Sequence, residues 1–130
     1  MIRARIPAVL ALGSLAGTLV ASTPDPLAGR IAGAPVQCID IRQNGGPQIV
    51  DSQTILYRPS GRRIWMTGPV GACPSLRPFD TLIVDVYSGQ LCHNDRFRTV
   101  SAGMSIPSAS CRFREFTPYD LPGKTRVPGK

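Results

Sequence analysis

Four cysteines are the side chains of this chain best suited to chemistry, and their spacing limits what that chemistry is. They are separated by 35, 19 and 19 residues and stand at Cys38, Cys73, Cys92 and Cys111. Structural zinc sites and dithiol redox centres usually take cysteines in close pairs, because one tight turn presents both thiols. No such pair is present, so we expect neither a metal site nor a redox centre.

Cysteine-based catalysis is also disfavoured. It needs a thiol and an imidazole brought together across the fold, with a third group that orients the base. The only histidine, His93, directly follows Cys92, and neighbouring side chains of an extended chain point to opposite faces. No carboxylate spacing singles out a glycosidase pair, and Gly-x-Ser-x-Gly is absent. We therefore expect no catalytic residue and no cofactor, with a small hydrolase of unrecognised site as an alternative.

The N-terminal residues indicate the compartment in which the cysteines work. Arg3 and Arg5 precede an apolar stretch at 6–20, which ends in Ala21 and Ser22. A basic start, a short apolar middle and a small-residue exit are typical of a signal peptide. The stretch is shorter than the roughly 20 residues of a membrane span. We predict cleavage after Ala21 or Ser22, no permanent membrane anchor, and a periplasmic or secreted protein.

In an oxidising compartment the four cysteines are expected to form two disulfides. Sequence alone leaves three connectivities open. Our preferred pairing joins Cys73 to Cys92, because these residues flank one predicted strand. It also joins Cys38 to Cys111, because the first and last strands become neighbours when a sheet closes.

The elements that must position these side chains are short β-strands. Apolar runs alternate with Gly, Pro, Asn and Ser, and no window beyond the leader carries a convincing helical stripe. Tyr57 and Trp65 are expected to face each other across a hairpin with its loop at 59–63, and 44–47 is expected to be a turn. The predicted strands cover residues 36–41, 54–58, 64–67, 81–87, 90–92, 96–100 and 111–116, and residues 49–50 are expected to begin or extend a strand.

This pattern predicts an all-β fold, a small antiparallel barrel or sandwich of about six strands that is disulfide-stapled. The alternative is α+β with one short helix near 74–76. Residues 23–35 are rich in Pro, Gly and Ala and predict a flexible linker. The predicted organisation is a signal peptide at 1–22, that linker, a β domain at 36–119 and a disordered basic tail at 120–130.

The strongest candidate for a binding site is Arg-Phe-Arg, which occurs at both 96–98 and 112–114. In a strand the two arginines of each motif share one face, while the phenylalanine points to the other. If the two strands lie close together, four guanidinium groups can bind an anion. The simpler interpretation is a half-buried strand with its arginines in water. The candidate residues are Arg96, Arg98, Arg112 and Arg114.

The net charge of the chain limits the classes of partner that we expect. The formal net charge is +7, and the balance of about +5 that remains without the leader favours phospholipid head groups, lipopolysaccharide and acidic polymers. Aromatic residues make up 6% of the chain, with one tryptophan, which argues against a base-stacking platform. We expect anionic envelope polymers or an envelope protein as partner and no nucleic acid. The oligomeric state stays open.

Four short segments carry the cysteines: 38–39 (CI), 73–76 (CPSL), 91–95 (LCHND) and 111–119 (CRFREFTPY). Together they resemble small exported proteobacterial proteins that are grouped as a domain of unknown function with four cysteines. The resemblance implies an envelope location and four structural cysteines, but no activity. We therefore predict a non-catalytic binding or structural module of the bacterial cell envelope. The alternative is a secreted inhibitor or effector that binds another protein.

Overall fold

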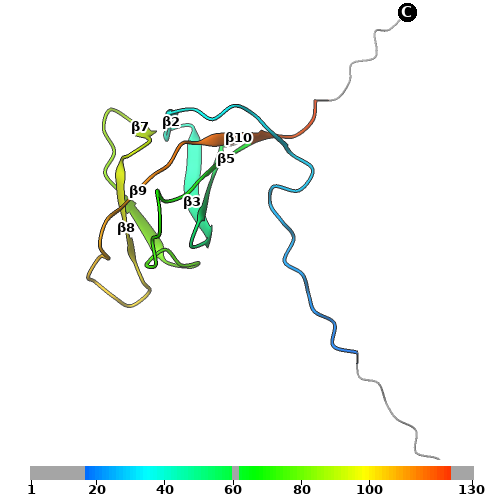
Figure 1. Cartoon of the computed structure of the whole chain (residues 1–130), viewed down its shortest axis with the longest axis horizontal. Helices are drawn as coiled ribbons and strands as arrows, with labels where there is room; N and C mark the ends of the chain where they lie inside the picture. Colours follow the sequence, from blue (N-terminus) through cyan, green and yellow to red (C-terminus); the bar gives the residue numbers. More distant parts are fainter. Residues whose placement is uncertain (1–16, 60–61, 124–130) are drawn as a thin grey trace, which may run out of the picture.

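The computed structural model describes residues 17–59 and 62–123. Most of the predicted signal peptide and of the predicted tail, and residues 60–61 of the hairpin loop, lie outside the described residues. Every regular element of the described residues is a β-strand, and the strands form three antiparallel sheets of five, two and three strands (Figure 1). This confirms the all-β prediction, with separate small sheets in place of one closed barrel. This part of the chain contains no helix long and apolar enough to cross a membrane.

The largest sheet is built around the predicted hairpin. Its strand order is β1 (Ile31–Ala32), β10 (Thr117–Asp120), β5 (Arg63–Thr67), β4 (Thr54–Pro59) and β3 (Asn44–Asp51). Tyr57 pairs with Trp65 across β4 and β5, as predicted. The turn predicted at 44–47 is wrong, because these residues begin β3. Pro47 is tolerated there because β3 is an edge strand, where a missing backbone donor costs no ladder hydrogen bond.

Two strands of this sheet lie outside the predicted pattern. β10 continues the chain beyond the strand predicted at 111–116, and β1 pairs with β10 although it falls in the predicted linker. The sheet therefore begins at Ile31 and includes Asp120, slightly beyond both predicted limits of the domain. A strand of two residues such as β1 has no periodicity of its own, so its pairing depends on β10.

The two smaller sheets contain the remaining strands. β2 (Cys38–Asp40) pairs with β7 (Gln90–Cys92), and β8 (Arg96–Val100) lies between β6 (Thr81–Val84) and β9 (Cys111–Arg112). The strand predicted at 81–87 ends early at Val84 because the chain turns before β7. In that turn Ser88 and Gly89 both have positive φ, as type I′ hairpin turns require.

Residues from all three sheets meet in one hydrophobic core. Phe97, Phe113 and Phe116 are buried, and the ring centroid of Phe113 lies 4.5 Å from that of Phe97 and 5.8 Å from that of Phe116. The same cluster includes Ile55 of β4 and Leu91 of β7. Because the three sheets share this core, they form one domain.

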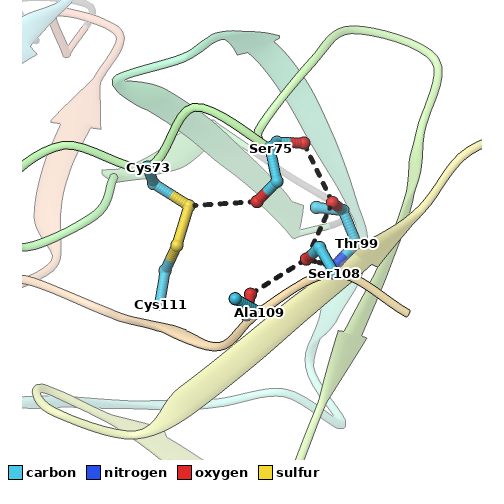
Figure 2. The surroundings of a disulfide bond; sticks show 6 residues. All are labelled: Cys73, Ser75, Thr99, Ser108, Ala109 and Cys111. Atoms are coloured by element: carbon cyan, nitrogen blue, oxygen red, sulfur yellow. Dashed lines mark hydrogen bonds between the residues drawn. A yellow bond between two sulfur atoms is a disulfide. The ribbon is translucent and has the colours of Figure 1, made fainter. Parts of the chain in front are cut away.

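The four cysteines form two disulfides, but the predicted pairing is wrong. Cys38 is bonded to Cys92, its direct partner in the β2–β7 register, with 4.0 Å between the Cα atoms. Cys73 is bonded to Cys111, with a Cα separation of 6.1 Å (Figure 2). The first predicted strand does meet the last one, but at Val36 and Phe116, so Cys38 lies out of reach of Cys111.

Each disulfide should stabilise the fold by restricting the unfolded chain. We expect the variants Cys38→Ser/Cys92→Ser and Cys73→Ser/Cys111→Ser each to lower the free energy of unfolding by about 2–4 kcal/mol. Urea denaturation measures this loss, and peptide mapping of the unreduced protein identifies the pairs. A peptide linking Cys73 to Cys92 would contradict the observed connectivity.

Tyr57 gives the fold a dependence on alkaline pH. Its hydroxyl is buried with no hydrogen-bond partner among the described residues, and burial raises the pKa of Tyr57 above its ordinary value. The folded state therefore keeps the proton where the unfolded state loses it, so stability falls as the pH rises above about 10. We expect Tyr57→Phe to raise the free energy of unfolding by about 1 kcal/mol and to weaken this pH dependence. If urea titrations below and above about pH 10 both show Tyr57→Phe to be less stable than the native protein, this account is contradicted.

Candidate anion-binding site

The two Arg-Phe-Arg motifs meet on the three-stranded sheet. Arg96 of β8 is the direct cross-strand partner of Arg112 of β9, and Phe97 pairs with Cys111. Phe97 is buried, whereas Arg96, Arg98 and Arg112 are exposed. The alternation of side chains thus places three guanidinium groups on the outer face of this sheet. We call these three residues the arginine face.

A hollow of about 330 Å³ lies beside the arginine face. It is lined by Asp85, Arg96, Arg98, Ser108, Ala109 and Ser110. Asp85 is exposed and lies more than 4 Å from every guanidinium nitrogen of the described residues. Ser108 and Ser110 were not predicted from the sequence. They lie in a loop without periodicity, and nothing in its sequence indicates that the loop folds back beside β8.

A disulfide and a polar network fix the segment that lines this hollow. The hydroxyl of buried Thr99 donates to the Ser75 carbonyl at 2.9 Å, and the Thr99 backbone N–H donates to the Ser108 hydroxyl at 3.0 Å. Figure 2 shows these bonds next to the Cys73–Cys111 disulfide. Arg112 directly follows Cys111, so the disulfide and the network together hold β9 against β8.

Arg114 does not join the arginine face. One of its Nη atoms donates to the Gln53 carbonyl at 2.9 Å, and its backbone N–H donates to the Gly68 carbonyl at 2.9 Å. The Arg114 carbonyl accepts a hydrogen bond from the Thr67 hydroxyl at 3.0 Å. The chain leaves the three-stranded sheet after β9, so the strand alternation no longer applies at Arg114. The four-arginine patch predicted from the sequence is therefore a patch of three.

Two other arginines of the described residues are paired with carboxylates. Arg42 pairs with Asp40 at 3.3 Å, and Arg63 pairs with Asp120 at 2.7 Å and lies over the Trp65 ring. Hydrogen bonds from the Arg42 backbone N–H and then its guanidinium lower the pKa of Asp40, and hydrogen bonds from Arg63 lower that of Asp120. By contrast, the arginine face has neither an ion pair nor a side-chain hydrogen bond to any described residue.

Two larger hollows carry no recognisable catalytic set. One, of about 580 Å³, is lined mainly by prolines and apolar residues that include Ile49 and Phe79. The other, of about 610 Å³, contains His93, whose Nδ1 lies 3.1 Å from the Gln37 amide oxygen. The Gln37 amide nitrogen in turn donates to Glu115 at 2.8 Å. The imidazole is thus held by an amide, and the part of the chain that the structure describes holds no metal-ligating cluster.

Comparison of the chain with protein-family models, curated proteins and solved structures gave no match. The resemblance to four-cysteine exported proteins therefore stays a prediction. The two disulfides themselves indicate an oxidising, extracytoplasmic environment, because thiols are kept reduced in the cytosol.

The contacts of Arg114 assign it a structural role that separates it from the arginine face. We expect Arg114→Gln to lower the free energy of unfolding by about 1 kcal/mol, because the Gln53 carbonyl loses a charged donor. Arg98→Gln, the matched control, should leave stability unchanged. Urea denaturation of both variants measures the difference, and equal stabilities would argue against a structural role for Arg114.

Proposed function

We propose that this protein is a non-catalytic module of the bacterial cell envelope that binds anionic polymers through Arg96, Arg98 and Arg112. The pairing of Arg96 with Arg112 carries the proposal. Like charges directly opposite each other on neighbouring strands are destabilising. A bound anionic group placed between the two guanidinium groups removes that repulsion.

The surroundings of the arginine face suit phosphate, sulfate or carboxylate groups. Guanidinium groups bind such oxyanions with two parallel hydrogen bonds, and the neighbouring Ser110 supplies a hydroxyl donor, whereas the Ser108 hydroxyl already donates to the Ala109 carbonyl. The three arginines are exposed, so each single contact is weak and screened by salt. A useful affinity therefore requires several contacts at once, which a polymer with repeated negative charges provides.

The compartment is consistent with such a ligand. The two disulfides support a location outside the cytoplasm, and the predicted signal peptide narrows it to the periplasm or the exterior. Lipopolysaccharide and other acidic polymers of the envelope are accessible there. The positive charge of the chain brings the protein to them through long-range attraction.

The variant Arg96→Gln/Arg112→Gln tests the proposal. At low salt we expect it to bind lipopolysaccharide and an acidic polysaccharide about tenfold more weakly than the native protein. Its stability should stay unchanged or rise by about 0.5 kcal/mol, because the cross-strand repulsion is lost. Binding is measured by calorimetry over a salt series, and stability by urea denaturation.

The matched control is Arg42→Gln/Arg58→Gln, which removes the same net charge from outside the arginine face, at the turn after β2 and on β4. The control should retain most of the binding. If both double variants lose affinity equally, the attraction comes from net charge alone and the arginine face is not a site. If the native protein binds neither probe at low salt, the proposed function is wrong.

A further inference from the structure

Phe79 is exposed in a way that the fold itself does not explain. Its side chain is 99% accessible to solvent, at the tip of the turn that precedes β6. The Arg77 carbonyl accepts a hydrogen bond from the Asp80 N–H at 3.3 Å, so Pro78 and Phe79 are the central residues of this turn. A large apolar side chain at such a position gains nothing from the protein core.

The backbone of Phe79 makes its exposure more unusual. Its φ is 70°, in the left-handed region that favours glycine. Proline followed by a residue with positive φ is the pattern of a type II turn, where glycine is the preferred third residue. A phenylalanine is therefore strained there. Strained residues often occur at functional sites, where the strain is part of the mechanism.

Two further apolar side chains lie at the same end of the three-stranded sheet. Thr81 pairs with Val100, so the turn before β6 and the loop after β8 adjoin one another. That loop projects from the sheet (Figure 1) and carries Met104 and Ile106, which are 61% and 77% exposed. We call Phe79, Met104 and Ile106 the apolar rim.

Unpaired cations accompany the apolar rim. Arg77 stands two positions before Phe79, is exposed, and has no ion pair or side-chain hydrogen bond within the described residues. Arg98 of the arginine face lies two residues before the end of β8, roughly 7 Å along the strand. The same end of the molecule thus presents apolar side chains at its tip and guanidinium groups behind them.

We propose that this end of the protein docks on an anionic lipid bilayer. The apolar rim enters the head-group region, while Arg77 and Arg98 bind lipid phosphates. A bilayer places its phosphates just outside an apolar layer, which matches this order of side chains. An apolar pocket of another protein fits less well, because the three apolar residues project from two separate loops with cations beside them. The inference rests on the proposed function, because Arg98 belongs to the arginine face. It identifies the anionic ligand of that function as a lipid bilayer.

The variant Phe79→Gly tests the docking and separates it from folding. Glycine relieves the positive φ, so the variant should melt at the same temperature as the native protein or higher. Its binding to vesicles of phosphatidylglycerol and phosphatidylcholine should weaken about tenfold, because one apolar side chain no longer leaves water. The matched control is Tyr87→Gly, which removes an exposed aromatic residue (74%) beyond the opposite end of β6 and should bind as the native protein does.

All proteins are purified after export, with identical N-termini verified by mass spectrometry, so that the leader does not contribute to binding. In Phe79→Trp, vesicles should shift the tryptophan emission to the blue relative to the native protein, whose single tryptophan is Trp65. Equal vesicle binding by Phe79→Gly and the native protein would overturn the inference. Binding of the acidic polysaccharide without binding of vesicles would also overturn it, but would leave the proposed function intact. If the native protein binds neither the vesicles nor the acidic polysaccharide, both proposals are refuted.

Discussion

The packing of Phe113 against both Phe97 and Phe116 is the interaction on which the rest of the structure depends. The three sheets have five, two and three strands. The two phenylalanines of residues 111–120 bring them together. Phe113 exchanges backbone hydrogen bonds with the loop after β7, and Phe116 exchanges them with Val36, just before β2. The same segment starts as β9 on one sheet and ends as β10 on another. A single stretch of chain therefore contacts all three sheets.

The path of this segment also explains why the site has three arginines. As long as the chain runs beside β8, its side chains alternate, so Arg112 is exposed while Phe113 is buried. At Phe113 the chain crosses toward the large sheet, and Arg114 meets the backbone of Gln53 and Gly68. The approach is close, since a Cβ atom on Gly68 would lie 1.9 Å from the Gln53 carbonyl oxygen. Two identical sequence motifs thus have different roles because their strands have different neighbours.

Local patterns in the sequence were sufficient for the elements that carry their own periodicity. The β4–β5 hairpin and β8 follow from alternating side chains and a proline–glycine loop, and two disulfides follow from four cysteines behind a predicted signal peptide. β1 and β10 could not be predicted, because each is defined by a partner distant in sequence. The same limit applies to the disulfide pairing, which depends on the β2–β7 register. The positive φ of Phe79 also left no sequence signal, because Arg-Pro-Phe-Asp is an ordinary turn composition.

Two features that oppose stability lie on the three-stranded sheet and in the turn that leads into it. The Arg96–Arg112 pair sets like charges opposite each other, and Phe79 holds a backbone conformation suited to glycine. In the large sheet, by contrast, Arg63 is paired with Asp120 and stacked on Trp65. The Cys73–Cys111 disulfide joins the loop that leads to Phe79 with the strand that carries Arg112. This covalent link offsets the local cost of both features, since neither the turn nor β9 is long enough to be held by its own backbone hydrogen bonds. The cross-link therefore ties the strand that carries Arg112 to the loop that leads to Phe79, as the proposed docking on a bilayer requires.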